Sequence, residues 1–413
     1  MINARGRLAL AAGAGARWAS RVTGRGAGAM IGGLVAIALD RSILSQLGTG
    51  RRSVVVTGTN GKSTTTRMTA AALQTIGAVA TNAEGANMDA GLVAALAADR
   101  AAGLAVLEVD EMHVPHVADA VEPAVVVLLN LSRDQLDRVG EINVIERRLR
   151  AGLATHPDAV VVANCDDVLM TSAAYDHANV VWVAAGGSWA ADSVSCPRSG
   201  EVIVRDHGHW YSTGADFKRP SPQWWFDAEN LYGPDGVTLP MRLALPGTVN
   251  RGNAAQAVAA AVAVGADPVA AVAAVSGVDE VAGRYRTTQV GAHTVRMLLA
   301  KNPAGWQEAL SMVDKDAAGV VIAVNGRVPD GEDLSWLWDV RFEEFEMHFH
   351  GTPVVAAGER GTDLAVRLGY ADVKHALVHD TVAAIASCPP GPVEVVANYT
   401  AFLQLQRRLA RHG

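Results

Sequence analysis

Short apolar runs, each followed by a segment of helical period, recur along much of this chain. Ser53–Val56 is the first clear run, and its β-branched residues favour a buried strand. Later runs follow the same pattern at Leu104–Glu108, Ala124–Asn130, Ala159–Ala163 and Val180–Ala184. Strands that alternate with helices are typical of a parallel sheet with helices on both faces. We therefore expect an α/β domain with a mainly parallel sheet over residues 51–284.

A second set of strand patterns begins near residue 295. Strands are expected at Val295–Leu299, Gly319–Val324, Pro353–Ala357 and Val393–Ala397, with helices at Gln307–Val313 and Tyr399–Arg411. The same alternation predicts a C-terminal α/β, Rossmann-like domain over residues 285–413. Residues 325–339, which follow one of these strands, are acidic, aromatic and rich in turn residues. A loop in that position is well placed for chemistry or for a partner.

Two segments depart from this alternation. Residues 186–222 are rich in Gly, Ser and Pro with one short strand pattern at Val202–Val204, which predicts a small β-rich insertion. Residues 1–50 hold scattered arginines and an apolar run, Ala29–Leu39, that is too short for the roughly 20 residues of a membrane span. We expect a helix pair packed on the α/β domain of residues 51–284, and a basic face lying near anionic lipid stays open as an alternative.

Composition excludes several classes of protein. The 413 residues are 50% hydrophobic and 19% charged, which is ordinary for a soluble globular chain of two or three domains. The net charge of −7 argues against a nucleic-acid binder. Three scattered cysteines form no disulfide framework, and this favours a reducing cytoplasm.

The strand at Ser53–Val56 leads into a glycine-bearing turn and then a helical pattern. Strand, loop and helix in this order hold phosphate groups, because backbone N–H groups and the helix dipole attract the anion. We expect Lys62 to reach the terminal phosphates and Ser63 to ligate Mg²⁺. The spacing G-x-x-G-K-S is shorter than the usual pattern, and a tight turn with an exposed lysine is the alternative. The expected nucleotide-binding residues here are Gly58, Thr59, Asn60, Gly61, Lys62, Ser63 and Thr64.

Further polar residues fall where ligands of parallel sheets bind, beyond the carboxyl ends of strands. Glu108 ends a strand and is the expected second Mg²⁺ residue, with a solvated acid as the alternative. Asn250 and Asn253 open a long Ala/Val helix, where an asparagine is a cap by default but could face the nucleotide. Arg284 is a candidate phosphate clamp, since a guanidinium binds phosphate in two-point fashion.

Several segments resemble the Mur ligase superfamily, and the resemblance covers nearly the whole chain. VTGTNGKST is similar to the phosphate loop of that superfamily, and NLSRDQLDRVGE, LPGTVNRGNAAQA and AGRYR are similar to three further motifs. KNPAGWQEAL (301–310) and DGEDLSWLWDVRFE (330–343) resemble segments of the narrower MurT family.

This resemblance implies a reaction and a partner. A MurT-type chain would use ATP with Mg²⁺ to phosphorylate the α-carboxyl of D-Glu in lipid II, and ammonia would displace the phosphate to give D-isoglutamine. The ammonia would come from a glutaminase subunit, GatD, in a heterodimer in the cytoplasm, where the lipid-linked substrate lies at the membrane surface. Lys62 would act on the phosphoryl group, and an aspartate would complete the partner's catalytic triad. Asp339 is the expected aspartate, and Asp333 is the second choice.

The chain also departs from the superfamily pattern. Gln135 stands where Mur ligases have His, and residues 146–150 lack the lysine that is carbamylated in the peptide-adding enzymes. Only some fifty residues precede the phosphate loop, so a domain for the UDP group is not expected. Of the four-cysteine zinc ribbon of many MurT relatives only Cys196 remains, in C-P-R-S-G, with the second knuckle reduced to residues 211–220. Since structural zinc needs four ligands, we expect the insertion to lack zinc.

Two other functions stay open on the sequence alone. A stand-alone amino-acid ligase of the folylpolyglutamate or peptide-adding type would need no glutaminase, and the missing lysine and UDP domain count against it. A non-catalytic scaffold would have no need of an intact G-K-S or of Glu108.

Overall fold

The structure is a computed structural model that describes residues 2–22, 29–82, 86–133, 139–187, 189–279, 285–331, 333–348 and 351–412. Arg284 and Gln135, both singled out above, lie outside the described residues. The chain forms two compact units, the first made of residues 1–131 and 140–279 and the second of residues 132–139 and 280–413. Each unit is described by itself.

Unit 1 is built on a six-stranded parallel sheet of order β2-β3-β1-β4-β5-β6. The central strand β1 pairs with β3 on one side and with β4 on the other, so that its side chains are buried on both faces. This explains the continuous apolar runs of the sequence. The parallel sheet predicted for this region is confirmed. The strands are β1 (Arg52–Thr57), β2 (Val79–Thr81), β3 (Leu104–Glu108), β4 (Val125–Leu128), β5 (Val160–Asn164) and β6 (Val180–Val183).

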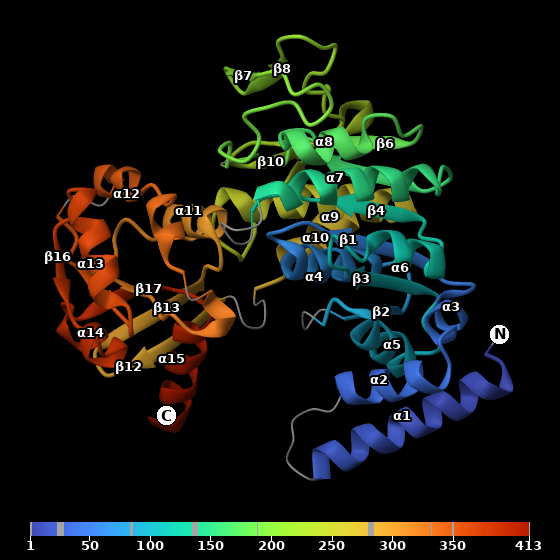
Figure 1. Ribbon diagram of the computed structural model, residues 1–413, viewed down its shortest axis with the longest axis horizontal. Helices are drawn as coiled ribbons and strands as arrows, with labels where there is room; N and C mark the ends of the chain where they lie inside the picture. The colour runs from blue at the N-terminus through green and yellow to red at the C-terminus, as the bar shows by residue number, and fades with distance from the viewer. Residues whose placement is uncertain are drawn as a thin grey trace. The chain divides into compact units, whose positions relative to one another are not determined.

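Helices cover both faces of this sheet (Figure 1). Helices α5, α6, α7 and α8 share one hydrophobic core with alternate residues of the strands, such as Val55 and Leu107. On the other face α4 and α9 contact the strands and pack on each other and on α10. The bounds are α4 (Lys62–Leu73), α5 (Asp89–Ala98), α6 (Val114–Val121), α7 (Val139–Ala154), α8 (Val168–Ala174), α9 (Thr248–Val264) and α10 (Pro268–Ser276).

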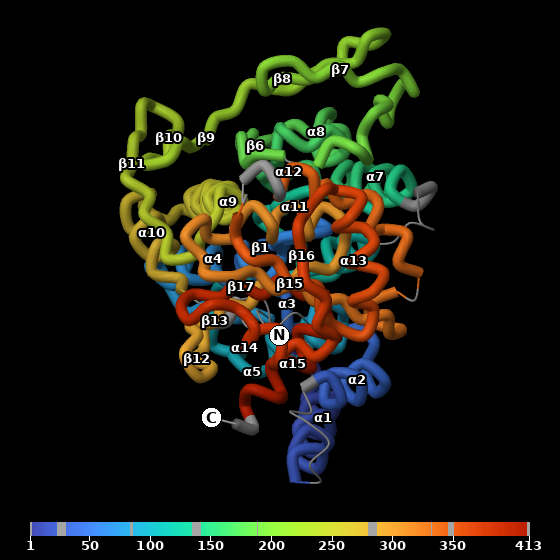
Figure 2. The backbone as a smooth tube through the Cα atoms, turned by 90° about the vertical axis from the view of Figure 1, so that its left-hand side faces the viewer, coloured from blue at the N-terminus to red at the C-terminus, as the bar shows by residue number. Residues whose placement is uncertain are grey.

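The N-terminal segment forms the predicted helix pair, followed by one more short helix. The helices are α1 (Ala4–Val22), α2 (Ala29–Leu39) and α3 (Ile43–Gly48). Helix α1 packs along α2, and α2 packs on α5. In Figures 1 and 2, α1 is the outermost helix of unit 1. None of the helices within the described residues is long and apolar enough to cross a membrane.

The β-rich insertion leaves unit 1 at β6 and returns to the same place. The backbone N–H of Ala184 donates to the carbonyl of Trp224 (2.8 Å), and Trp224 forms a parallel bridge with Val183. The segment contains a hairpin, and a small antiparallel sheet follows it beyond residue 222. These strands are β7 (Ile203–Asp206), β8 (His209–Ser212), β9 (Trp225–Phe226), β10 (Asn230–Tyr232) and β11 (Thr238–Pro240), with the 3₁₀ turn η2 (Pro234–Gly236).

The remnant of the cysteine knuckle is held by packing. Cys196 is buried in a small core with Val168, Ile203, Trp210 and Phe217. Burial raises the pKa of its thiol, but hydrogen bonds from Ser199 and neighbouring groups outweigh burial and leave the pKa lowered. Within the described residues, no three His, Cys, Asp or Glu side chains are grouped so as to hold a metal. That the insertion works without zinc stays a prediction.

Unit 2 has a six-stranded sheet of order β12-β13-β17-β14-β15-β16, in which only β12 is antiparallel to its neighbour. The four predicted strands are present, and β12 and β16 are additional. The strands are β12 (Tyr285–Val290), β13 (His293–Leu299), β14 (Gly319–Ala323), β15 (Val354–Ala357), β16 (His375–Leu377) and β17 (Gly391–Ala397). The helical elements are α11 (Pro303–Ser311), η3 (Val328–Asp330), η4 (Ser335–Trp338), α12 (Phe342–His348), α13 (Gly361–Tyr370), α14 (Thr381–Ser387) and α15 (Tyr399–His412).

Two hydrophobic cores sandwich this second sheet. One core joins it to α11, α13 and the turn-rich segment after β14, and the other joins it to α14 and α15. An α/β unit with helices on both faces therefore forms here too, as the sequence predicts. Figure 2 shows these elements in the orange-to-red part of the chain.

Candidate functional site

The loop between β1 and α4 requires glycine at two positions. Gly58 and Gly61 have φ angles of +142° and +83°, a region that L side chains rarely adopt. A Cβ atom at Gly58 would lie 2.8 Å from the Cβ of Leu129, and one at Gly61 would lie 2.7 Å from Oδ1 of Asn253. Gly61 is also the N-cap of α4, so the loop delivers the first turn of that helix, whose N–H groups lack intrahelical partners.

Asn130, directly beyond β4, holds the loop in place. Its side-chain amide donates to the carbonyl of Asn60 (3.0 Å), and its Oδ1 accepts from the N–H of Asn60 (2.9 Å). Its backbone carbonyl accepts from the N–H of Thr59 (2.9 Å). The N–H groups of Thr59 and Asn60 are thus bonded to the protein itself.

Lys62 is buried, so the alternative of an exposed lysine in a tight turn is wrong. Only 8% of the residue is exposed, and its ammonium donates to the carbonyls of Gly58 and Thr59. It also forms an ion pair with Oε1 of Glu111 at 3.2 Å. Burial raises the pKa of Glu111, and the charge of Lys62 opposes that rise. Glu111, which lies three residues beyond the end of β3, is thus brought to Lys62.

Glu108 is the last residue of β3 and is buried, with 3% exposed. Its backbone N–H and carbonyl are both paired with the side chain of Asn82 at 2.8 Å. Its side-chain Oε2, however, is buried and has no hydrogen-bond partner within the described residues. An unpaired buried carboxylate oxygen is costly unless a cation or donor meets it. The alternative of a solvated strand-end acid is therefore wrong.

These groups suit a magnesium ion that accompanies a nucleotide. Ser63, in the first turn of α4, and Glu108 supply the oxygen ligands that Mg²⁺ prefers. Such an ion keeps several waters and takes further oxygens from phosphates, so it needs no cage of three protein carboxylates. The orphaned Oε2 of Glu108 fits this kind of site, and Mg²⁺ there stays a proposal.

The two asparagines of α9 have different surroundings. The N-cap of α9 is Gly247, so the default expectation of an asparagine cap is wrong. Asn250 is fully buried and donates to the carbonyl of Pro246 (2.6 Å). Asn253 lies against Gly61 of the phosphate loop and donates to Oδ1 of Asn250 (3.3 Å). Asn253 is thus brought to the loop, and Asn250 lies behind it.

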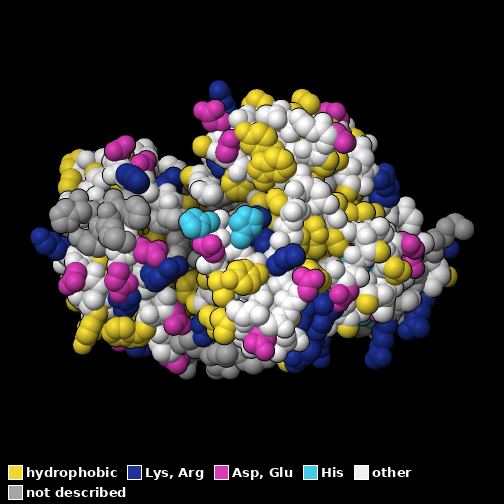
Figure 3. Space-filling view, turned by 90° about the horizontal axis from the view of Figure 1, so that it is seen from above, with side chains coloured by type: hydrophobic (Ala, Val, Ile, Leu, Met, Phe, Trp, Pro, Cys, Tyr) yellow, Lys and Arg dark blue, Asp and Glu magenta, His cyan; other side chains and the backbone are white. Residues whose placement is uncertain are grey.

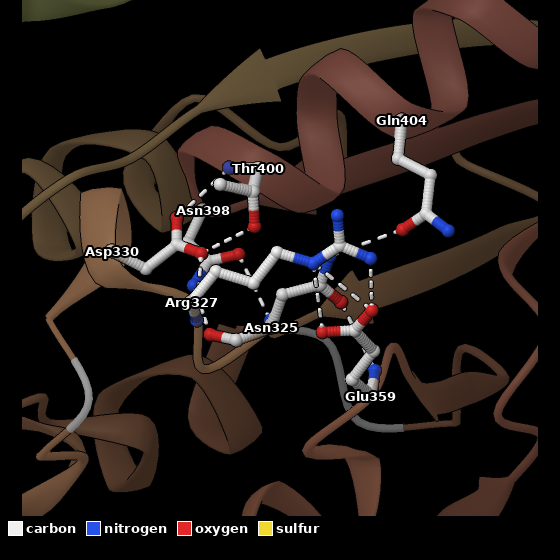
Figure 4. A network of polar contacts seen from close by, with 7 residues as sticks. All are labelled: Asn325, Arg327, Asp330, Glu359, Asn398, Thr400 and Gln404. Carbon is white, nitrogen blue, oxygen red and sulfur yellow. Dashed lines mark hydrogen bonds and ion pairs between the residues drawn. The ribbon is translucent and has the colours of Figure 1, made fainter.

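In unit 2, the corresponding edge of the sheet is occupied by the protein's own side chains (Figure 4). Arg327 forms an ion pair with Glu359, which follows β15. Asp330 accepts hydrogen bonds from the N–H (2.8 Å) and hydroxyl of Thr400 at the start of α15. Asn325 and Asn398, which follow β14 and β17, exchange two hydrogen bonds of 3.0 and 2.7 Å. This network, which also includes Gln404, fixes the start of the acidic loop.

The two candidate aspartates lie further along this loop. Asp333 is exposed and accepts from the N–H of Ser335 (2.8 Å), a local turn that lowers the pKa of its carboxyl. Asp339 follows η4 and is half-buried, and its Oδ2 is buried with no hydrogen-bond partner in the described part of the chain. Asp339 therefore carries the unsatisfied acceptor, whereas Asp333 stabilises its own turn.

Arg367 of α13 anchors the backbone on either side of Asp339. It donates to the carbonyls of Leu337 (3.2 Å) and Val340 (2.7 Å), and its guanidinium lies over the ring of Trp338 at 5.5 Å. A cavity of about 350 Å³ opens beside this anchor. Its lining includes Asp333, Ser335, Trp338, Arg360, Asp363 and Arg367.

Comparisons with known proteins cover both units. The Mur ligase middle domain matches residues 56–261, and the MurT ligase C-terminal domain matches residues 299–402. The chain is 28% identical to the lipid II isoglutaminyl synthase (glutamine-hydrolyzing) subunit MurT of Streptococcus pneumoniae, over 93% of both chains. The subunit of the same name from Staphylococcus aureus (strain COL) is also 28% identical, over 96% of both chains.

Solved structures agree on the fold. A pseudomurein peptide ligase type C from Methanothermus fervidus has a TM-score of 0.71 at 16% identity, covering 90% of this chain and 81% of its own. MurF from Acinetobacter baumannii has a TM-score of 0.64 at 16% identity, covering 91% and 80%. At such identities the likeness concerns the fold alone. The two domain matches and the near full-length relatives show that the chain belongs to the MurT family of the Mur ligase superfamily, a group of ATP-dependent ligases.

Proposed function

We propose that this chain is the ATP-using subunit of a lipid II isoglutaminyl synthase, acting in peptidoglycan synthesis. It would amidate the α-carboxyl of D-Glu in the lipid II stem peptide, with ammonia from a glutaminase partner of the GatD type. The near full-length likeness to two MurT subunits supports this proposal. Both relatives are named as subunits of a glutamine-hydrolysing synthase, which supports a partner subunit.

The first half-reaction is assigned to the loop edge of unit 1. A carboxylate oxygen of the substrate would attack the γ-phosphorus of ATP, and the bond to the bridging oxygen would break to release ADP. Lys62 would lie against the transferred phosphoryl group and stabilise its charge, a role worth several kcal/mol in such sites. To do so its ammonium must exchange the carbonyls of Gly58 and Thr59 for phosphate oxygens. Ser63 and Glu108 would hold Mg²⁺, which supplies charge neutralisation when bound.

The second half-reaction would form the amide. The nitrogen of ammonia would attack the acyl carbon, inorganic phosphate would leave with its electron pair, and a proton would be released. The ammonia itself would come from glutamine hydrolysed in the partner, and Asp339 would contribute there. A carboxylate beside a catalytic histidine orients the ring and stabilises its charged form. The unsatisfied, buried Oδ2 of Asp339 supports its assignment over Asp333.

The observation that carries the proposal is that Glu108 in unit 1 and Asp339 in unit 2 each keep a buried carboxylate oxygen without a hydrogen-bond partner within the described residues, as Asp89 and Glu146 of unit 1 also do. Glu108 suits a cation beside a nucleotide, and Asp339 suits a hydrogen-bond donor from another molecule. A stand-alone ligase would have use for the first and none for the second.

Asp339→Asn tests this assignment in the complex with the glutaminase. We expect glutamine-dependent amidation of lipid II to fall by about 10²-fold or more, because the amide cannot stabilise a charged histidine. Amidation with free ammonium chloride should stay within about twofold of wild type, since the loop edge of unit 1 is intact. Asp333→Asn serves as the matched control and should leave both rates near wild type. An equal loss with both nitrogen sources would refute the triad role of Asp339.

A further inference from the structure

The helical hairpin of α1 and α2 reverses the usual placement of side chains. In a surface helix of a globular protein, large apolar residues face the core. Here the buried positions of α1 are mostly small, and its large apolar residues are exposed: Leu8 (72%), Trp18 (68%) and Val22 (66%). The arrangement buries little side-chain volume inside and leaves an apolar surface outside.

The outward face of α1 is an apolar stripe. Leu8, Ala11, Gly15, Trp18 and Val22 follow one another at helical spacing, and all five are exposed. Arg7 and Arg21 lie to one side of this stripe by helical period and are also exposed. A helix with an apolar face bordered by arginines and a tryptophan has the character of an interfacial membrane helix.

Helix α2 continues the same pattern without a single polar residue. Its sequence is AMIGGLVAIAL, and the exposed large residues are Met30, Ile31, Leu34 and Leu39. Glycines instead make its inner contacts. A Cβ atom at Gly32 would lie 2.8 Å from the carbonyl oxygen of Gly13 in α1, and one at Gly33 would lie 1.9 Å from that of Ala90 in α5. The hairpin is therefore fitted closely to unit 1, and its outward face is a fixed part of that unit.

The charge of this segment differs from that of the chain as a whole. On the face shown in Figure 3, hydrophobic side chains form separate patches, and acidic side chains lie in several places between them. The first 39 residues, in contrast, contain five arginines and no acidic residue, although the whole chain carries a net charge of −7. Positive charge combined with exposed apolar side chains complements a surface that is negative and has an apolar interior.

We propose that the α1–α2 hairpin docks unit 1 on an anionic phospholipid bilayer, with the outer stripe of α1 inserted at the level of the headgroups. The arginines would contact lipid phosphates, and Leu8, Trp18 and Val22 would reach the acyl boundary. The hairpin would lie on the membrane and not cross it. This inference goes beyond the proposed function, because it rests on the hairpin alone and applies to any substrate.

Vesicle sedimentation with the full chain tests the docking. Sucrose-loaded vesicles of 70% phosphatidylcholine and 30% phosphatidylglycerol are incubated with the protein in the absence of lipid II and ATP. We expect the wild-type chain to sediment with these vesicles and not with pure phosphatidylcholine. Raising the salt concentration should weaken binding, since the lipid charge is screened. Leaving out substrate and nucleotide separates this result from the fate of the proposed function.

Variants of the outer stripe locate the contact. Leu8→Ser combined with Trp18→Ser should lower the partition coefficient by about tenfold or more, because two apolar insertions are lost. Arg7→Gln combined with Arg21→Gln should lower it by about tenfold on the anionic vesicles. The matched control is Val269→Ser with Val328→Ser, at positions that are 60% and 77% exposed elsewhere on the chain. All of these positions are exposed, so unchanged thermal unfolding is the expected check on folding.

Three results would overturn the proposal. The first is equal sedimentation with and without phosphatidylglycerol. The second is equal binding by the stripe variants and the control. The third is a concentration-dependent dimer in light scattering that Leu8→Ser with Trp18→Ser dissociates while vesicle binding is absent. That last result would make the stripe an interface between copies of this chain.

Discussion

The carboxyl edges of the two sheets have the same architecture and opposite chemistry. In both units, polar residues follow parallel strands at this edge, where ligands of such folds bind. In unit 1, Glu108 keeps a buried oxygen without a partner, and Lys62 is held by two backbone carbonyls and one acid. In unit 2, Arg327, Asp330 and Asn325 are all paired with other protein groups.

The comparison shows that the fold alone does not identify a ligand site. What separates the two edges is that the edge of unit 1 keeps one buried carboxylate oxygen, Oε2 of Glu108, without a partner within the described residues. We call the edge of unit 1 the open edge, because we expect its contacts to be exchanged for those of a ligand. We call the edge of unit 2 the closed edge, because its paired groups hold the loop that carries Asp339, whose Oδ2 has no partner within the described residues. Four changes, from the largest expected effect to the smallest, test this distinction.

Removing the ammonium group of Lys62 from the open edge should have the largest effect. We expect Lys62→Ala to reduce ATP-dependent amidation by at least about 10²-fold, because charge stabilisation of the transferred phosphoryl group is lost. The same change leaves Glu111 buried without its ion-pair partner, which is itself destabilising by about 3 kcal/mol.

A double variant separates these two effects. Lys62→Ala with Glu111→Gln removes the stranded charge, so thermal stability should return toward wild type while amidation stays lost. Recovery of activity together with stability would show that Lys62 acts only as a structural partner of Glu111.

Adding a methyl group at Gly61, in the open edge, should have the next largest effect. Gly61→Ala forces a side chain into a φ of +83° and places it 2.7 Å from Asn253. We expect ADP affinity, measured by calorimetry, to weaken by about tenfold or more, since relieving a strain of about 1–2 kcal/mol would move the loop. Gly236→Ala has a similar φ of +76° but open space around the added atom, so it should leave ADP affinity unchanged.

Removing the side chain of Asp330 from the closed edge should lower the stability of unit 2 and leave nucleotide binding unchanged. Asp330→Ala removes both acceptors of Thr400, and we expect unit 2 to lose about 1–3 kcal/mol. Urea unfolding followed by near-UV circular dichroism measures the loss, and Trp306 and Trp336, which stack in the core of unit 2, contribute to that signal. ADP affinity should stay within about twofold of wild type. A large loss of ADP affinity would mean that the closed edge also serves the nucleotide.

The smallest effect is expected for Asp167, a carboxylate beside the open edge that already accepts two hydrogen bonds from backbone N–H groups. Asp167 caps α8 by accepting from the N–H of Met170 (2.8 Å), and it also accepts from the N–H of Leu131 (3.1 Å). Burial nevertheless raises the pKa of Asp167 from 3.8 to about 6. The folded state therefore binds this proton more tightly, and the residue adds stability as the pH falls from about 6 toward 4.

Asp167→Asn isolates this contribution. The unfolding free energy of wild type minus that of the variant should increase by at most about 3 kcal/mol between pH 7 and pH 4.5. Urea titrations at several pH values measure the difference. A difference that shrinks on acidification would contradict the raised pKa.

Local patterns were sufficient for much of the fold. Strands buried on both faces produce continuous apolar runs, so β1, β3, β4, β5 and most of the second sheet follow from the sequence. The edge strand β12 contains Thr287, Thr288 and Gln289, and the short β16 is mostly exposed, so neither produces such a run. The glycine loop and Glu108 are local signals as well.

The remaining features of the site depend on contacts between distant residues. Asn130 holds a loop that lies 70 residues earlier, and Asn253 meets Gly61 from α9. No spacing rule connects such pairs, because tertiary packing alone brings them together. The pairing of Lys62 with Glu111 likewise depends on tertiary contacts that a sequence does not contain. The preference for Asp339 over Asp333 came from the sequence, and the structure adds that Oδ2 of Asp339 is buried without a partner within the described residues.

A single hydrogen bond, from the N–H of Ala184 to the carbonyl of Trp224, joins the two ends of the insertion after β6. When the two ends of a segment meet at one strand, the residues between them can change without altering the path of the sheet. Closing a loop of any length there costs only a slowly growing entropy. The insertion can therefore have a packed apolar core, like the one around Cys196, in place of metal ligands, or be as short as a turn. The sheet and its nucleotide edge stay the same in each case.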